Sequence, residues 1–201
     1  MINLATMAES FTARNASATA LIDPVSGTTR TFGDLAQRTG QLSAALYEVL
    51  GVRPGARVAA MSRNSLEMVE LYLACARTGA LLFPLNWRFS ASQVVDALRD
   101  AAPSVVFYES EFADVIAGVR AEVDATWIEW ETAKDTQYED LLARMAFKAD
   151  DIRRLLPDPA SLVHQPYLAV STGGTTGIPK SAVHTQYSYG AATINYHTAA
   201  P

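Results

Sequence analysis

The chain has 201 residues, of which 49% are hydrophobic, and its formal net charge at pH 7 is −5. These values are typical of a globular protein with a sizeable core and exclude an intrinsically disordered chain. The acidic balance, together with the absence of a lysine- or arginine-rich run, argues against a nucleic-acid partner, because neutralising phosphates requires a basic face. A local anion site built from backbone amides remains compatible with this charge.

Cysteine, histidine and the N-terminal segment narrow the functional classes further. Cys75 is the only cysteine, so an intrachain disulfide and a cysteine-based zinc site are excluded. It lies in the apolar run "LYLACARTGA", which favours a buried, unreactive thiol. The three histidines show no metal-ligand spacing. The first residues lack the pattern of a secretory signal, and no segment has the length of a membrane span, so we expect a cytoplasmic protein.

The first fifty residues contain two predicted helices. Leu4, Met7 and Phe11 recur at helical spacing and predict a short amphipathic helix, followed by an irregular stretch. Thr31 and Asp34 then form a candidate capping box for a long helix.

From residue 57 onward, short apolar strands alternate with helices. Strands are predicted at residues 57–62, 80–85, 104–109 and 125–130. The helices between them are predicted at residues 64–79, with Asn64 as the N-cap, at 90–102, with Ser90 and Gln93 as a capping box, and at 111–123. Such alternation indicates a layered α/β fold, in which a mainly parallel sheet carries helices on both faces.

The pattern loosens between residues 131 and 166, where we expect a surface excursion containing a short helix at 138–146. Strands are then predicted at residues 167–171 and 181–185, and a helix at 186–200. Between these two strands lies the stretch "STGGTTGIPKS", residues 171–181, which can make little core.

The chemistry of this stretch points to anionic oxygens. Its glycines allow a close approach of backbone amides to a ligand, successive amides form a concave anion site, and threonine hydroxyls and a lysine add donors. It is not a Walker A loop, because Pro179 rather than glycine precedes Lys180 and the following segment alternates like a strand. The alternative is a flexible glycine turn. Trp87 and Arg88 in "NWRFS" are interpreted as packing and surface residues outside the site.

Residues 172–181, "TGGTTGIPKS", resemble the phosphate-binding signature of the adenylate-forming (AMP-binding) superfamily, whose usual form is T-S-G-T-T-G-x-P-K-G between two strands. Three positions depart from the pattern: Gly173 replaces a serine, Ser181 replaces a glycine, and Gln186 stands where many members have histidine. Upstream, "TFGDLAQRTGQLSAAL" and "PLNWRFS" are similar to early segments of acyl-CoA synthetases, so the resemblance spans nearly the whole chain.

The resemblance implies a two-step reaction in which ATP activates a carboxylic acid, such as a fatty acid, and a thiol, usually that of coenzyme A, displaces AMP. It implies that the loop holds the β- and γ-phosphates of ATP with Mg²⁺. The residues so implicated are Thr172, Gly173, Gly174, Thr175, Thr176, Gly177 and Lys180. It assigns no catalytic residue and no protein ligand for a metal within this chain.

The length of family members implies that residues 1–201 are the N-terminal part of an adenylation domain, without the rest of the large domain and the C-terminal lid. We therefore expect the chain to be inactive alone, and we expect self-association through apolar surface that the missing part would cover. Two alternatives stay open: a stand-alone nucleotide- or phosphate-binding module without catalysis, and an assembly domain with a vestigial loop.

Overall fold

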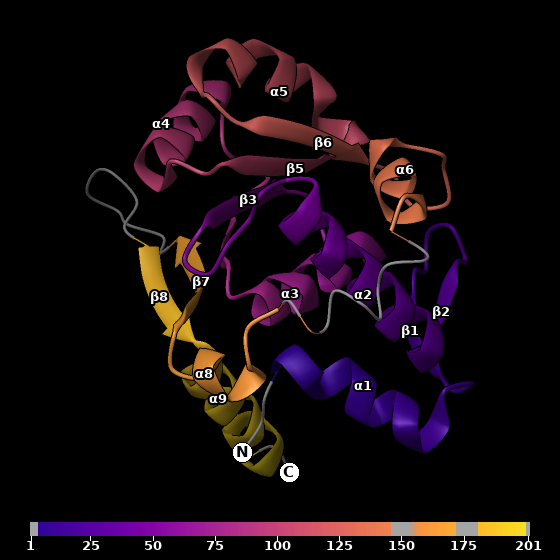
Figure 1. Cartoon of the computed structure of the whole chain (residues 1–201). Coiled ribbons are helices and arrows are strands. Elements are labelled where there is room, and N and C mark those ends of the chain that lie inside the picture. The colour runs from indigo at the N-terminus through magenta and orange to yellow at the C-terminus, as the bar shows by residue number, and fades with distance from the viewer. Residues whose placement is uncertain (1–3, 146–153, 155, 172–180, 200–201) are drawn as a thin grey trace.

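The computed structural model describes residues 4–145, 154, 156–171 and 181–199 (Figure 1). In chain order the described helices are α1 (Leu4–Asn15), α2 (Phe32–Glu48), α3 (Leu66–Thr78), α4 (Ala91–Ala101), α5 (Ala113–Val119), α6 (Gln137–Ala143), α8 (Pro159–Leu162) and α9 (Gln186–Ala199). The strands are β1 (Thr19–Ile22), β2 (Thr29–Thr31), β3 (Arg57–Met61), β4 (Leu81–Pro84), β5 (Val105–Glu109), β6 (Thr126–Trp130), β7 (Pro166–Ser171) and β8 (Ser181–Thr185). Short 3₁₀ turns at Ser110–Phe112 and Arg120–Glu122 flank α5.

A six-stranded sheet with the order β6-β5-β3-β4-β7-β8 forms the centre of the molecule. The pairs β5/β6, β3/β5, β3/β4 and β4/β7 are parallel, and only β8 runs antiparallel to its neighbour β7. The predicted mainly parallel sheet is confirmed, and so is the predicted α/β fold.

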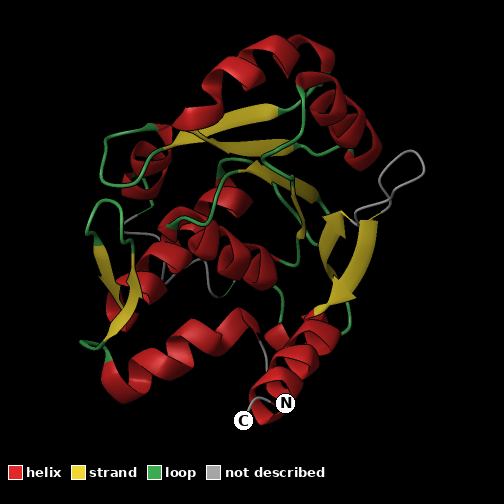
Figure 2. Ribbon diagram, turned by 180° about the vertical axis from the view of Figure 1, so that it is seen from behind, coloured by secondary structure: helices red, strands yellow, loops and turns green. Residues whose placement is uncertain are grey.

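Helices cover both faces of this sheet, as predicted. Figures 1 and 2 show α4 and α5 on one face, α2 and α3 on the other, and α1 as a further layer outside them. Successive residues of β3 enter the two cores in turn: Val58 and Ala60 face α2, α3 and α6, whereas Ala59 and Met61 face α4 and α5. This alternation follows from the two-residue repeat of a strand, and because both faces are buried the strands are apolar throughout.

Local capping determines where several helices begin. The Thr31 side chain accepts a hydrogen bond from the backbone N–H of Asp34, whose carboxylate accepts one from the backbone of Thr31, so the predicted capping box of α2 is confirmed. The box of α4, Ser90 with Gln93, is also confirmed. The predicted N-cap of α3 is wrong. Ser65 rather than Asn64 caps this helix, because its hydroxyl accepts from the backbone N–H of Met68.

A small antiparallel hairpin, β1–β2, occupies part of the stretch that the sequence predicted to be irregular. Its turn is closed by the Asp23 carboxylate, which accepts from the backbone N–H groups of Val25 and Ser26. The prediction missed it because each strand is only three or four residues long.

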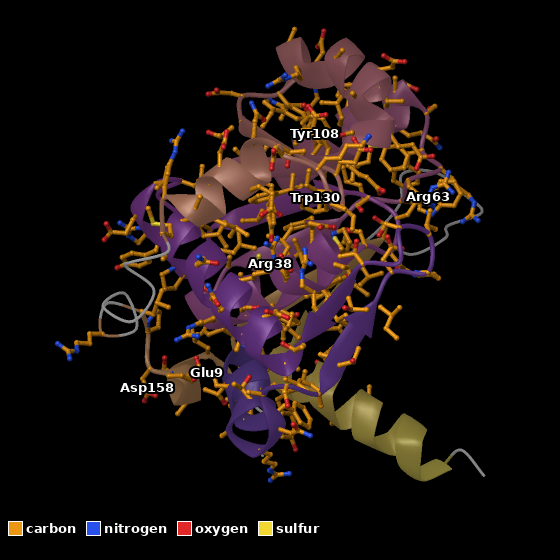
Figure 3. All side chains as sticks on the ribbon, turned by 90° about the vertical axis from the view of Figure 1, so that its right-hand side faces the viewer. Glu9, Arg38, Arg63, Tyr108, Trp130 and Asp158 are labelled. Atoms are coloured by element: carbon orange, nitrogen blue, oxygen red, sulfur yellow. The ribbon has the colours of Figure 1, made fainter. Side chains whose placement is uncertain are left out.

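A buried charge network joins α2, α3 and α6. The Glu70 carboxylate, fully buried on α3, accepts from Arg38 Nε at 2.7 Å and from the Tyr138 hydroxyl at 2.6 Å. Arg38 also pairs with Glu139 at 2.6 Å. Burial by itself lowers the pKa of Arg38, but the hydrogen bonds to Glu139 and Glu70 outweigh it and raise that pKa, which keeps the guanidinium charged. Figure 3 shows Arg38 in the interior, among the helices.

Candidate functional site

Strands β7 and β8 frame the predicted phosphate loop. Ser171, the last residue of β7, is the register partner of Ser181, the first residue of β8. The chain between these two serines therefore leaves and re-enters the sheet at one place. Residues 172–180, which include all seven predicted phosphate-binding residues, lie outside the described residues. What the structure shows is the frame that carries them, and that frame is the predicted pair of strands.

The frame opens at the carboxyl edge of the parallel strands. Because β7 runs parallel to β4, and β4 parallel to β3, the loop begins at the same edge where β3, β4 and β5 end. In open α/β sheets, ligands bind beyond the carboxyl ends of the strands. The predicted loop thus begins at the edge of the sheet where this rule expects a binding site.

The connections after β3 and β5 meet at this edge through polar contacts. The Glu109 carboxylate accepts from the Ser62 hydroxyl and from the backbone N–H of Arg63, each at 2.9 Å. The Arg63 guanidinium pairs with Glu111 at 2.5 Å. Figure 3 shows Arg63 at the rim of the molecule, well away from the interior network of Arg38.

An aromatic ring at the same edge lies close to two guanidinium groups. The guanidinium carbon of Arg63 lies 4.7 Å from the centre of the Trp87 ring, and that of Arg88 lies 4.0 Å from it. Within the part of the chain that the structure describes, Arg88 forms no ion pair. From the sequence alone, Trp87 and Arg88 were interpreted as packing and surface residues outside the site. The signal that could have included them is their position directly after a strand, in the motif "NWRFS".

Buried hydrogen bonds attach the hairpin to the body. The Gln186 side chain, 1% exposed, donates from Nε2 to the backbone carbonyl of Ala76 at 2.8 Å. The Tyr167 hydroxyl donates to the backbone carbonyl of Tyr72 at 3.1 Å, and burial raises its pKa, so it stays a neutral donor. These contacts fix β7 and the start of α9, directly after β8, to α3. They also give Gln186, one of the three departures from the family pattern, a structural role.

Two further observations concern the cysteine and the candidate metal ligands among the described residues. Cys75 is buried, and burial raises the pKa of its thiol, as expected for an unreactive cysteine. The described residues contain no group of three or more histidine, cysteine or acidic side chains arranged to hold a metal ion. None of the described helices is both long and apolar enough to cross a membrane.

The donors of the predicted loop suit ATP better than a metal held by the protein alone. Amides, hydroxyls and one lysine are donors to phosphate oxygens, whereas Mg²⁺ takes oxygen ligands and is usually held by one or two carboxylates together with substrate phosphates. A loop with this donor set would therefore take a nucleotide that brings its own Mg²⁺.

A family model described as "AMP-binding enzyme" matches residues 8–200, which include the predicted loop. An indoleacetate–CoA ligase from Aromatoleum aromaticum is 37% identical over 158 residues, covering 77% of this chain and 30% of that protein. A fatty acid–[acyl-carrier-protein] ligase, ScoC, from Streptomyces coeruleorubidus is 30% identical over 164 residues, covering 81% and 29%.

The fold has solved counterparts as well. A fatty acyl CoA synthetase from Mycobacterium tuberculosis superposes with a TM-score of 0.79 at 26% identity, over 98% of this chain and 37% of that one. The chain thus spans about 30% of the length of the curated relatives it matches.

Proposed function

This chain belongs to the AMP-binding enzyme family, and we propose that it is the N-terminal part of a ligase that activates a carboxylic acid with ATP and passes the acyl group to the thiol of coenzyme A. The observation that carries the proposal is the frame: two paired strands present residues 172–180 at the carboxyl edge of a parallel sheet. The resemblance of those residues to a phosphate-binding signature supplies the chemistry.

In the proposed reaction, an oxygen of the carboxylate attacks the α-phosphorus of ATP, and the bond from that phosphorus to the bridging oxygen breaks. Pyrophosphate leaves, and the acyl-adenylate remains. A thiol then attacks the acyl carbon and AMP departs. Negative charge develops on the leaving pyrophosphate, so preorganised donors around it lower the barrier.

We assign this role to the amides of Gly173, Gly174 and Gly177, to the hydroxyls of three threonines and to the ammonium of Lys180. The threonines are Thr172, Thr175 and Thr176. Mg²⁺, when bound to the phosphates, supplies further charge neutralisation. Arg88 adds a cation without an ion-pair partner among the described residues, at the edge where the polyanionic nucleotide would arrive.

The proposal extends to the whole protein. Residues 1–201 would supply the phosphate loop and one layered half of the large domain, while the adenine and acyl contacts and the lid would come from the rest of a longer polypeptide. The chain alone would be inactive. Exposed apolar side chains on β7, β8 and α9, among them Val170, Val183 and Tyr187, would let it self-associate. We place the reaction in the cytoplasm, where ATP and coenzyme A are both supplied.

Carboxylate-dependent exchange between ATP and pyrophosphate, measured on the longer protein, tests the proposal. Lys180→Ala should slow the exchange about tenfold or more, since a hydrogen bond to a charged group contributes about 1.5–3 kcal/mol. The matched control is Lys134→Ala, because Lys134 is exposed and, among the described residues, its ion pair is with the surface residue Glu131. Exchange that no carboxylic acid stimulates, or that Lys180→Ala leaves unchanged, would contradict the proposal.

A further inference from the structure

The last turn of α3 is held by a side chain from a distant part of the chain. The carbonyls of the final four residues of a helix have no partner within it, so other donors must supply one. The Cys75 carbonyl accepts from the backbone N–H groups of Gly79 and Ala80. The Ala76 carbonyl accepts from Nε2 of Gln186, which is 110 residues further along the chain, at 2.8 Å. Gln186 therefore attaches the segment after β8 to the end of α3.

This attachment lies in the interior of the protein. Ala76 is 0% exposed and Gln186 is 1% exposed. Breaking a buried hydrogen bond leaves an unsatisfied donor or acceptor, so such a bond holds its two groups firmly in one geometry. The next residue, Tyr187, adds a second attachment, because its backbone N–H donates to the Val163 carbonyl at 2.9 Å. The chain is therefore fixed at the point where β8 ends and α9 begins.

Strand β8 links this attachment to the predicted phosphate loop. The strand runs from Ser181, the residue after Lys180, to Thr185, the residue before Gln186. A strand advances about 3.3 Å per residue, so the attachment lies about 16 Å from the point where the loop joins the sheet. Each residue of β8 has a register partner on β7, so the two strands form one continuous hairpin. A change of direction at Gln186 would therefore be carried along β8 to Ser181.

We propose that Gln186 is a positioning residue for the phosphate loop: its bond to Ala76 sets the direction in which β8 presents Lys180 to the phosphates of ATP. This inference rests on the function proposed above for the loop. Gln186 would act through β8 and would not contact the nucleotide. An amide side chain does not titrate, so the bond would keep its strength across the pH range of activity, whereas a histidine at this position would titrate near neutral pH.

Two substitutions at position 186, compared in the longer protein, test this role. Gln186→Leu removes the donor, whereas Gln186→His keeps one, because a neutral imidazole carries an N–H. In carboxylate-dependent exchange of ATP and pyrophosphate, Gln186→Leu should lower kcat about ten- to hundredfold, since a shift of about 1 Å far from the chemistry can cost a hundredfold. It should leave the KM for the carboxylic acid unchanged. Gln186→His should recover most of the lost kcat at about pH 8, where the imidazole is neutral.

Ser43→Ala is the matched control for a general loss of stability. Ser43 is 0% exposed, and its hydroxyl also donates to a helix carbonyl, that of Thr39, at 2.7 Å. It belongs to α2, however, and not to the β7–β8 hairpin. This variant should lower the midpoint of thermal unfolding without lowering kcat. An equal fall of kcat in Ser43→Ala and Gln186→Leu would mean that lost stability, and not lost positioning, explains both.

Amide hydrogen exchange of the longer protein gives a readout that does not depend on activity. The amides of β8 that bond to β7 should exchange about tenfold faster in Gln186→Leu and at the original rate in Gln186→His. Unchanged β8 amides in Gln186→Leu would overturn the positioning role. A full kcat in Gln186→Leu, where Lys180→Ala slows the reaction, would overturn that role alone. A longer protein without carboxylate-dependent pyrophosphate exchange would instead contradict the proposed function, and the positioning role with it.

Discussion

Replacing Arg38 with methionine should destabilise the fold strongly, because it removes the main cation beside a fully buried carboxylate. Glu70 is 0% exposed, and Arg38 Nε lies 2.7 Å from its Oε1. The second cation, Arg30, is farther away, at 3.4 Å. The Tyr138 hydroxyl still donates to Oε2 at 2.6 Å in the variant. The carboxylate would therefore keep one good hydrogen bond and one weak ion pair.

Removing one partner of a buried ion pair typically costs about 3–5 kcal/mol, because the charge left behind is uncompensated. Because Glu70 keeps some of its contacts, the free energy of unfolding of Arg38→Met should fall by an amount near the lower end of this range, about 3 kcal/mol. Small domains have total stabilities of only about 5–15 kcal/mol, so such a loss is readily measured.

Urea unfolding followed by tryptophan fluorescence provides the assay, because Trp130 is fully buried and its ring lies 5.8 Å from that of Tyr138. The double variant Arg38→Met/Glu70→Gln is the control, since a neutral amide at position 70 leaves no unpaired charge at the fully buried position, while Glu139, which loses Arg38 in both variants, is partly exposed. It should be more stable than Arg38→Met alone. A loss below about 1 kcal/mol in the single variant, or a double variant that is no more stable than the single one, would refute the reasoning.

Two further substitutions test other parts of the fold. Burial raises the pKa of Glu67, so its carboxylate destabilises the folded state at neutral pH, and that cost disappears as the pH falls toward the usual value of a glutamate. Glu67→Gln should therefore raise the free energy of unfolding at neutral pH, and the variant should be no more stable than the original protein in mild acid. A stability difference between the two proteins that does not change with pH would contradict a raised pKa at Glu67. Gly79 has φ +76°, and an added Cβ would lie 2.9 Å from Leu162 Cδ2. Gly79→Ala should therefore lower the free energy of unfolding by about 1–3 kcal/mol, measured by thermal unfolding. Gly118→Ala, in a helix with open space around it, should cost nothing, and equal effects of the two alanines would argue against a strained turn at Gly79.

Features of the fold that depend on neighbouring residues were predictable from the sequence. The capping boxes of α2 and α4, the left-handed Gly79 that ends α3 and the apolar strands all arise within a few residues of chain. Asn64 and Ser65 are both good N-cap residues, and sequence alone does not choose between adjacent candidates. The order of the strands was not predictable, because the pairing of Leu82 with Leu168 joins distant segments.

The candidate site likewise has features that were predictable from the sequence and features that were not. Its glycines, threonines and lysine are consecutive, so the chemistry of the loop could be proposed from residues 171–181 alone. The contact of Arg63 and Arg88 with Trp87 depends on β3 and β4 ending at the same edge, which only the parallel topology establishes.

The most direct test of the central claim is a crystal structure of the longer protein with a non-hydrolysable ATP analogue. The account predicts that the β- and γ-phosphate oxygens lie within hydrogen-bond distance of the amides and hydroxyls of residues 172–177 and of the Lys180 ammonium. Phosphates bound elsewhere, with this loop making no contact to them, would contradict it.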